Sequence, residues 1–238
     1  MSTITAPARS SAFARSQSKD KSVTCKNYRP ATNGDFKTEM MSFVAQERAL
    51  ACHPETPSQW VSTMQARLSQ VRDGVIAITY ALQGGISHLF LPGRCAPSRV
   101  DGLWQHTCFE AFVSVKGATE YREFNFAPSG QWAAYAFRGY RDSGPLPQAS
   151  APQITVRTSG NCFELDALIH RESLPPLPVN ARLLLGLSAV IEEEGGVLSY
   201  WALKHPPGPP DFHHAGAFVL ELDPRMAAVV DPAYTGKP

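Results

Sequence analysis

Apolar and polar residues alternate in short stretches along most of the chain, and glycine, proline or asparagine separates one stretch from the next. Such alternation places successive side chains on opposite faces of a β-strand. The stretches with this pattern are Gly74–Leu82, His88–Leu91, Thr107–Val115, Tyr121–Phe126, Gln131–Phe137, Ile154–Thr158, Cys162–Ile169, Arg182–Glu193, Val197–Ala202 and Ala217–Leu222. About ten short strands joined by turns predict an all-β fold, a single antiparallel β-sandwich of the jelly-roll type.

One stretch on the N-terminal side has helical spacing instead. Its large apolar residues recur at intervals of three or four positions: Trp60, Met64, Leu68 and Val71. Thr56 or Ser58 precedes them and is a suitable capping residue. Because an amphipathic helix repeats every 3.6 residues, we expect one short helix here.

Both ends of the chain lack any such period. Residues 1–42 are rich in Ser, Thr, Ala and Lys and contain few large apolar groups, which predicts a disordered tail. Met40 and Met41 stand where the apolar pattern begins, so the true translation start could lie there. Residues 43–223 are the predicted sandwich, and residues 224–238 are a loose C-terminal tail.

Composition and charge exclude several classes of protein. The chain has 238 residues, is 43% hydrophobic and has a formal net charge of +1, with no basic stripe to neutralise phosphates, so we expect no nucleic-acid partner. Neither a membrane-spanning run nor a secretory signal is evident, which favours a cytoplasmic protein without a membrane partner. The five cysteines are scattered and odd in number, which argues against a disulfide framework or a cysteine-rich zinc site.

A crowded polar face is predicted between Leu103 and Arg141. In the predicted strand Thr107–Val115, successive side chains point to opposite faces. One face is apolar, and the other carries Glu110. In the next strand the same alternation separates Phe124 and Phe126 from three polar residues, Tyr121, Glu123 and Asn125. A hairpin turn at Lys116-Gly117 would place Glu110 near Asn125. The aromatic neighbours of this face are Trp104, Trp132, Tyr135, Phe137 and Tyr140.

Two interpretations of this face stay open at this point. A polar outer face is normal for an antiparallel sandwich, so the group could simply be solvated. Aromatic rings beside fixed carboxylates and amides are instead typical of a site for a small polar ligand with flat apolar patches, such as a sugar.

A proline-rich segment from Ser199 to His214 is the second unusual feature. Its stiff loop carries Trp201, His205, Asp211 and His213, which could wall a ligand site. Alternatively, His205 and Asp211 could hydrogen-bond the loop while Phe212 fills the core. A metal held by His205, Asp211 and His213 or His214 is a third interpretation. No common metal-binding spacing is present, so we expect no metal.

Other chemistries find little support in the residues. His106 and Cys108 share a predicted face, but no oxyanion hole accompanies them, so nucleophilic catalysis is not expected. Glycine loops that bind phosphates or dinucleotides are missing. Beyond the N-terminal tail the methionines are Met64 and Met226, both outside the predicted strands, so haem ligation would depend on two histidines. We expect no cofactor, with haem as the alternative.

The residues also resemble a known family. LWQHTCFEAFVSV (from Leu103) followed by YREFNFAPSGQWAAY (from Tyr121) is similar to the DOMON-like branch of the superfamily that includes DOMON domains and family 9 carbohydrate-binding modules. GLSAVIEEEGGVLSYWALKHP and PDFHH resemble later landmarks of this branch, and the resemblance extends from about Leu50 to Leu222. It implies a β-sandwich that binds a carbohydrate or, in other branches, haem.

The resemblance can be followed residue by residue. Glu110 matches the strand carboxylate, and Tyr121 and Glu123 match a Y-x-E motif. Pro128 and Gly130 match the turn that follows, and Trp132 matches the aromatic residue after it. The acidic residue usually found before the first strand is replaced by His106-Thr107.

These observations together predict a non-catalytic β-sandwich that binds a saccharide or a sugar-containing metabolite. Arg138 would hydrogen-bond hydroxyls, or Arg138 and Arg141 would clamp a phosphate or carboxylate of the ligand. The alternatives are a haem-binding redox module, an interaction module that uses the proline-rich loop, and an enzyme with His106, Glu110 and His205 as acid–base groups. The predicted ligand-binding residues are Trp104, His106, Glu110, Tyr121, Glu123, Asn125, Trp132, Tyr135, Arg138, Trp201, His205, Asp211 and His213.

Overall fold

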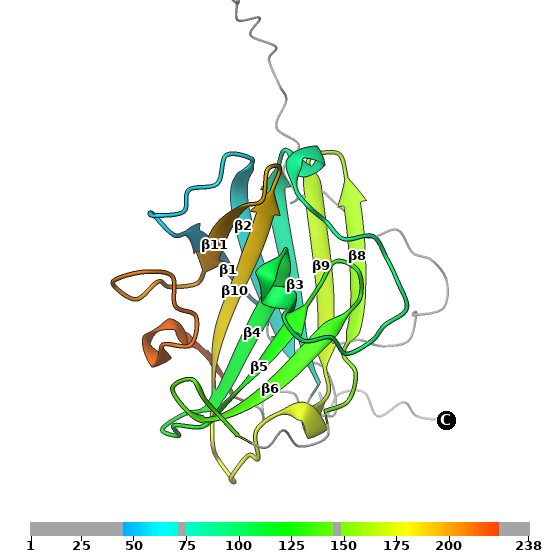
Figure 1. The fold of residues 1–238 in the computed structure, drawn as a ribbon. Coiled ribbons are helices and arrows are strands. Elements are labelled where there is room, and N and C mark those ends of the chain that lie inside the picture. The colour runs from blue at the N-terminus through cyan, green and yellow to red at the C-terminus, as the bar shows by residue number, and fades with distance from the viewer. Residues whose placement is uncertain (1–44, 71–74, 145–148, 224–238) are drawn as a thin grey trace, which may run out of the picture.

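Two antiparallel layers of strands form a β-sandwich in the computed structural model, which describes residues 45–70, 75–144 and 149–223 (Figure 1). The back layer has the strand order β1 (Ala45–Cys52), β2 (Val61–Gln70), β3 (Ile76–Gly84), β9 (Cys162–Ile169) and β8 (Gln153–Ser159). The front layer has the order β7 (Asp142–Ser143), β6 (Trp132–Gly139), β5 (Tyr121–Phe126), β4 (Cys108–Val115), β10 (Leu183–Glu193) and β11 (Val197–Ala202). A short strand, β12 (Leu220–Leu222), also pairs with β10. The predicted fold class is confirmed.

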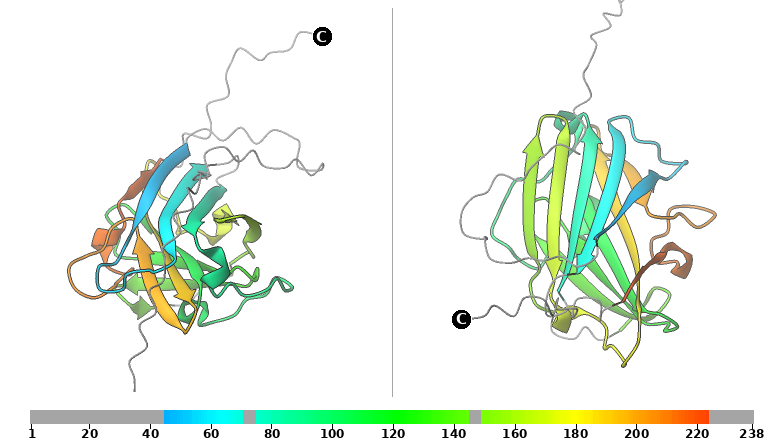
Figure 2. Two further views of the ribbon diagram at one scale, coloured as in Figure 1. Left: turned by 90° about the horizontal axis from the view of Figure 1, so that it is seen from above. Right: turned by 180° about the vertical axis from the view of Figure 1, so that it is seen from behind.

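Strand β1 belongs to both layers. Most of its length pairs with β2, from Ala45 to Leu50. Its last two residues, Ala51 and Cys52, pair instead with β11 of the front layer. The two layers are therefore joined by main-chain hydrogen bonding at this edge. Figure 2 shows β1, in blue, running along the edge.

The core lies between the layers and follows the alternation expected from the sequence. In β3 the buried side chains are Ile76, Ile78, Tyr80 and Leu82, at every second position. Phe109 of the front layer stacks on Phe163 of the back layer, with ring centroids 5.6 Å apart. The Tyr80 hydroxyl donates a hydrogen bond of 2.6 Å to the main-chain oxygen of Glu110. This contact fixes the spacing of the layers at the middle of β4.

Most of the predicted strands are confirmed, but the predicted helix is wrong. Its residues form β2, in which Met64, Ala66 and Leu68 point into the core at every second position. An irregularity in pairing between Val61 and Thr63 shifts the register there. Ala66 is too small to mark the buried position between Met64 and Leu68 in the sequence. The large apolar residues therefore recur every four positions, which imitates the spacing of a helix.

Two other elements differ from expectation. The segment His88–Leu91 is not a strand: a 3-10 turn covers Ile86–His88, and Leu89 makes an isolated bridge to Glu193. The closing strand β12 is shorter than predicted because a 3-10 turn occupies Ala215–Ala217. The predicted tails, residues 1–42 and 224–238, lie outside the described residues.

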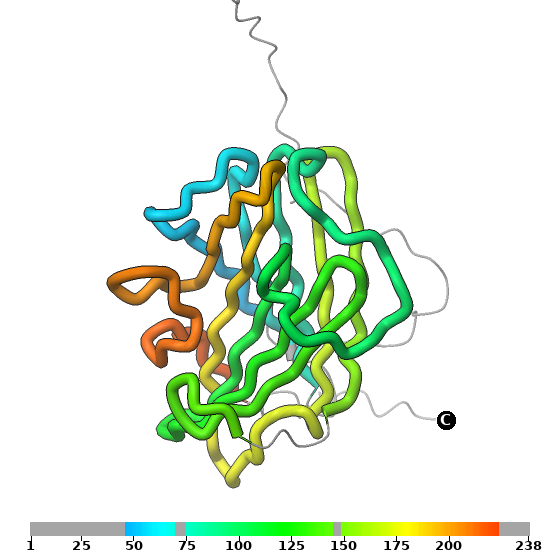
Figure 3. Tube along the Cα trace, in the orientation of Figure 1, coloured from blue at the N-terminus to red at the C-terminus, as the bar shows by residue number. Residues whose placement is uncertain are grey.

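The central strands of the front layer are covered on both faces. Every residue of β5 is buried, and so is nearly every residue of β4 and β10. On the side away from the core, a 3-10 turn at Leu103–Gln105 lies in front of β4 and β5 (Figure 1). The loop from 203 to 219 approaches the turn between β6 and β7 at one end of the same layer (Figure 3). This turn and this loop thus cover the polar face that the sequence predicted.

None of the helical turns in the described part of the chain has the length and apolar character that crossing a bilayer requires.

Gly84 provides a test of the packing between β2 and β3. Its φ is +154°, and a Cβ placed on it would lie 2.0 Å from the main-chain oxygen of Trp60. We expect Gly84→Ala to lower the free energy of unfolding by more than about 2 kcal/mol, since main chain must move to accommodate the methyl group. Gly117→Ala is the matched control, because it also has a positive φ but nothing lies within 4 Å of its Cβ position. The control should cost only about 1 kcal/mol in urea denaturation, and equal losses would show that the contact with Trp60 has no effect.

Candidate functional site

The polar residues predicted on one face of β4 and β5 do gather there. Glu110 pairs directly with Asn125 across the two strands, as the hairpin register predicted. Their neighbour Glu123 lies diagonally across from Glu110 on the same face. Glu110 is 3% exposed, Glu123 5% and Asn125 0%. The interpretation of this face as an ordinary solvated surface is therefore wrong.

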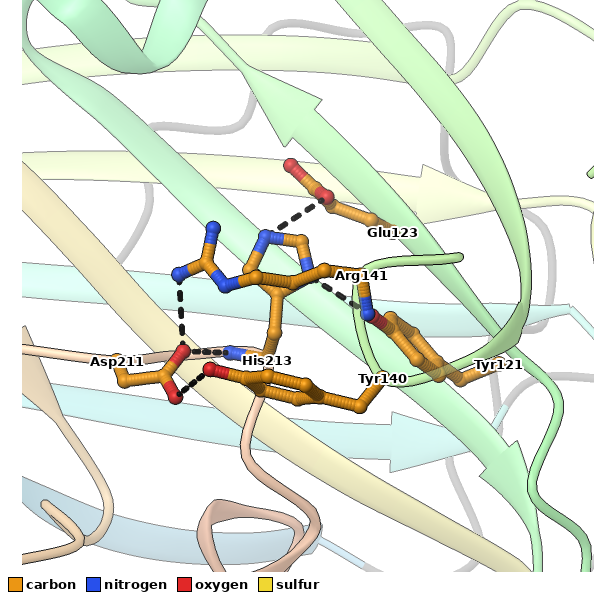
Figure 4. Close-up of polar contacts among 6 residues, drawn as sticks. All are labelled: Tyr121, Glu123, Tyr140, Arg141, Asp211 and His213. Carbon is orange, nitrogen blue, oxygen red and sulfur yellow. Dashed lines mark hydrogen bonds and ion pairs between the residues drawn. The ribbon is translucent and has the colours of Figure 1, made fainter. Parts of the chain in front are cut away.

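Glu123 connects this buried group to the loop of residues 203–219. Its Oε1 accepts a hydrogen bond of 2.9 Å from the amide of Asn125. Its Oε2 lies 3.7 Å from Nε2 of His213, which comes from the loop (Figure 4). Residues from two distant parts of the sequence thus meet at one carboxyl group.

Asp211 organises the exposed end of the site. One of its carboxylate oxygens accepts hydrogen bonds from the main-chain N–H of His213 at 3.1 Å and from the guanidinium of Arg141 at 3.0 Å. The other accepts a hydrogen bond of 2.8 Å from the hydroxyl of Tyr140. Tyr140 and Arg141 lie in the tight turn between β6 and β7, where Arg141 has a left-handed φ of 54°. Asp211 therefore ties the loop to this turn.

Tyr121 links the exposed end to the buried end. Its hydroxyl accepts a hydrogen bond of 3.1 Å from the main-chain N–H of Arg141 and lies 2.9 Å from Nδ1 of His213. Since a neutral imidazole can accept at one nitrogen, the Tyr121 hydroxyl donates to Nδ1, and the proton of His213 is on Nε2, facing Glu123.

The apolar neighbours hold these groups in place. The ring of Tyr121 stacks on Phe137 with centroids 4.6 Å apart. The ring of His213 packs edge-on against both Phe112 and Phe137, each at 5.1 Å. Phe218, from the end of the loop, stacks on Phe112 at 5.7 Å. We call the exposed residues Tyr140 and Arg141, together with the half-buried Asp211, the rim, and the buried residues Glu110, Glu123 and Asn125 the floor.

Burial controls the charge state of the floor. Desolvation, together with the field of Glu123, raises the pKa of Glu110 well above its usual range. Desolvation also raises the pKa of Glu123 to about 7, although the hydrogen bond from Asn125 and the charge of Arg141 oppose this effect. Desolvation and the Arg141 charge lower the pKa of His213 to about 4. Between about pH 4 and pH 7, the contact between Glu123 and His213 thus joins two neutral groups and is not a salt bridge.

The rim has the opposite character. Although burial disfavours its ionisation, hydrogen bonds from Tyr140 and Arg141 keep the pKa of Asp211 below its usual range. Asp211 therefore stays ionised at neutral pH and pairs with the Arg141 guanidinium. A charged, solvent-facing rim lies above a floor that prefers to be neutral.

Two buried polar atoms beside the floor have no hydrogen-bond partner in the structure. They are Oδ1 of Asn125 and Oγ of Ser188. Ser188 pairs with Glu110 from the β10 side, just as Asn125 pairs with it from the β5 side. Glu110 is thus flanked in one row by two unpartnered oxygen atoms. Sequence reasoning missed Ser188, although the alternation of β10 already placed it opposite the core.

The structure brings together seven of the predicted site residues. Glu110, Tyr121, Glu123, Asn125, Asp211 and His213 contact one another as described, and Tyr135 pairs with Glu123 in the register of β5 and β6. The hydroxyl of Tyr135 turns away to Asp101, 3.0 Å from its Oδ1. This hydrogen bond ties the loop that covers β4 and β5 to strand β6.

Two predicted aromatic residues belong to the hydrophobic core. Trp132 and Trp201 are buried between the layers, at 7% and 5% exposure. The indole N–H of Trp201 donates to Ser199 Oγ at 3.1 Å. Stacking on a ligand was the wrong role for both, because their strand positions face the interior.

The remaining predicted residues lie apart from this site. Trp104 is exposed, and His106 lies 2.7 Å from Glu192. Arg138 pairs with Asp142 on the surface. His205 bonds the main-chain oxygen of Ala51 at 2.8 Å, in agreement with the interpretation that it hydrogen-bonds the loop.

The catalytic alternatives lose their geometric basis. His106 contacts Glu192 and His205 bonds the main-chain oxygen of Ala51, so each histidine is engaged with a partner other than Glu110. Desolvation raises the pKa of the Cys108 thiol well above its usual range, which opposes formation of a nucleophilic thiolate. Within residues 45–223, wherever the structure describes them, no three His, Cys, Asp or Glu side chains are arranged to hold a metal ion.

Comparisons with known proteins support the fold. No protein-family model matches the sequence. No curated protein matches it either. A solved structure of a candidate carbohydrate-binding protein from Bacteroides uniformis is similar, with a TM-score of 0.52 and 14% sequence identity, over 74% of this chain and 84% of that chain. At this identity the likeness establishes a shared β-sandwich fold.

A second solved structure gives a weaker match. It is a family 9 carbohydrate-binding module from Caldicellulosiruptor kristjanssonii in complex with cellotriose. The TM-score is 0.43 and the sequence identity 9%, over 69% of this chain and 75% of that chain.

The raised pKa of Glu123 predicts how stability depends on pH. A carboxyl group whose folded-state pKa lies above its unfolded value stabilises the fold below about pH 4.5, and this contribution is lost as the pH rises through about 7. The difference corresponds to on the order of 3 kcal/mol. Glu110, whose pKa burial also raises, makes stability fall with pH in both proteins. We expect the free energy of unfolding to fall between pH 5 and pH 8 in the wild type and to fall less steeply in Glu123→Gln, by the contribution of Glu123 alone.

The comparison of the two proteins separates this effect from that of His213. The lowered pKa of His213 makes stability rise with pH between about 4 and 6.5, but it does so in both proteins. Glu55→Gln, at an exposed position in the turn after β1, is the matched control and should behave as the wild type. Parallel curves for the wild type and Glu123→Gln in urea denaturation would contradict the prediction.

Proposed function

We propose that the protein is a non-catalytic carbohydrate-binding β-sandwich whose ligand contacts the rim formed by Tyr140, Arg141 and Asp211. The observation that carries the proposal is the combination, at one exposed place, of a flat aromatic ring and an ordered set of charged hydrogen-bonding groups. Tyr140 is 62% exposed, so one face of its ring is open to solvent. The apolar face of a pyranose packs on such a ring.

The polar groups of the rim suit hydroxyl groups. The Arg141 guanidinium offers several donors in a fixed plane, and one of them already bonds Asp211. The Asp211 carboxylate is a strong acceptor held in one orientation by Tyr140, Arg141 and the main chain of His213. Held in this way, donors and acceptors lose little freedom when a ligand binds, which favours affinity.

Three further observations support this function over an enzymatic one. The floor carboxyl groups are buried, so neither is positioned to attack or protonate a ligand on the rim. The solved structure that shares the fold is described as carbohydrate-binding. The motifs around Glu110 and Glu123 resemble the DOMON-like branch, for which a sugar ligand is one expectation. Within this proposal the protein needs no cofactor.

The first experiment is a thermal-shift screen with glucose, xylose, maltotriose, xylotriose and cellotriose. A ligand that binds only the folded state raises the melting temperature in proportion to its saturation of the site. Haem should be screened in parallel, because an absorption band from bound haem would favour the redox alternative. If no saccharide shifts the transition, the proposed function is wrong.

Substitution of Tyr140 tests the place of binding. We expect Tyr140→Ala to weaken saccharide binding at least about tenfold, or about 1.4 kcal/mol, because the stacking surface is removed. Tyr140→Phe keeps the ring but loses the hydrogen bond to Asp211, so it should retain most of the affinity. Trp104→Ala is the matched control, since it removes an exposed aromatic side chain that is not part of the rim.

Calorimetric titration of the four proteins decides the outcome. Cooperative thermal unfolding of each variant would show that the fold is intact. If Trp104→Ala loses binding and Tyr140→Ala keeps it, the ligand does not bind at the rim.

A further inference from the structure

The rim and the floor are joined by a continuous series of contacts. It runs from the main-chain N–H of Arg141 to the Tyr121 hydroxyl, then to His213, and from His213 to Glu123 (Figure 4). From Glu123 it continues to Asn125, which pairs with Glu110. The rim is thus connected to the buried carboxyl groups through Tyr121 and His213.

No cation neutralises the floor directly. Among the described residues, no lysine or arginine forms an ion pair with Glu110 or Glu123. Arg141 is the cation whose field favours ionisation of Glu123, and its guanidinium is already bonded to Asp211. The other titratable groups near the pair are uncharged at neutral pH: Cys108 on β4, Tyr80 across the core, Tyr121 on β5, Tyr135 on β6 and His213 on the loop.

The hydrogen-bonding geometry also favours a proton on the pair. The unpartnered oxygens Asn125 Oδ1 and Ser188 Oγ flank Glu110 on its two sides. Asn125 Oδ1 can only accept a hydrogen bond, and a carboxylate can only accept as well. A protonated Glu110 carries an O–H group and can donate to this oxygen. Protonation thus satisfies a buried atom that an ionised floor would leave unsatisfied.

We propose that ligand binding at the rim is coupled to proton uptake by the buried acid pair Glu110 and Glu123, so that affinity falls as the pH rises through neutrality. This inference rests on the proposed function. A ligand on the rim excludes water above Glu123 and His213, which makes the carboxylate form of Glu123 less favourable. It also engages the Arg141 guanidinium, the one charge that favours that form. Both effects act in the same direction.

Linkage fixes the sign of the consequence. If the ligand favours the protonated pair, protons favour the ligand to the same extent. If binding raises the pKa of the pair by one unit, the affinity at high pH is about tenfold lower than the affinity at low pH. His213 contributes nothing to this change above about pH 5.5, because its pKa is about 4 and it is neutral there in both states.

The test is calorimetric titration of the wild type at pH 6 and pH 8.5 with the saccharide from the screen that binds. We expect affinity at pH 8.5 to be roughly tenfold lower, the change that corresponds to one pKa unit. Near pH 7, titrations in two buffers of different ionisation enthalpy should show net proton uptake on binding.

Two variants identify the source of the proton. Glu123→Gln should lose most of the pH dependence and the proton uptake, whatever its absolute affinity, because the amide keeps a donor but cannot titrate. Glu55→Gln should keep both, since it removes an exposed carboxyl group that belongs to neither the rim nor the floor. The infrared carbonyl band of a protonated carboxylic acid in the ligand-free wild type at pH 6 should weaken in Glu123→Gln.

The outcomes separate this inference from the function on which it rests. Saccharide binding of equal affinity at both pH values would overturn the coupling and leave the proposed function intact. Binding at neither pH would overturn the proposed function and the coupling with it. A pH dependence that persists unchanged in Glu123→Gln would also overturn the coupling to the acid pair.

Discussion

Two carboxyl groups, Glu110 and Glu123, lie on a strand face that loops cover, and an ionised carboxylate there has lost its water without gaining a cation. This constraint explains much of the surrounding structure. The amide of Asn125 bonds Glu123, neutral His213 is its other neighbour, and charge is confined to the rim, where solvent reaches Arg141. Replacing buried ionisable groups by well-packed apolar ones is often neutral or stabilising, so the presence of two acids here favours a role beyond packing.

The covering segments are held by polar contacts to the strands and, at one end, by a small apolar cluster. Tyr135 bonds Asp101, and Glu192 bonds both His106 and Thr107, which secures the loop over β4 and β5. The loop that carries Asp211 is secured at the rim and by the rings around Phe112. Polar anchors of this kind can rearrange locally while the sandwich stays intact.

Much of the fold was predictable because a strand in a two-layer sandwich shows its faces in its own sequence. The pairing of Glu110 with Asn125 followed from alternation and one hairpin turn. The arrival of His213 beside Glu123 could not be derived, since it depends on the path of a long loop between β11 and β12. Trp132 and Trp201 were misassigned because aromatic residues suit a core and a sugar site equally well. The prediction of a helix at β2 was wrong because the pairing irregularity near Val61 and the small Ala66 together gave the large apolar residues a helical spacing.

Strand β1 pairs with β2 along most of its length and with β11 at its end, so it is shared by the two layers. A shared strand means that neither layer can detach without breaking main-chain hydrogen bonds in the other. The sandwich is therefore expected to melt as a single cooperative unit, and any ligand bound at one edge stabilises the whole domain. A force that separates the two layers would have to break the main-chain hydrogen bonds between β1 and β11.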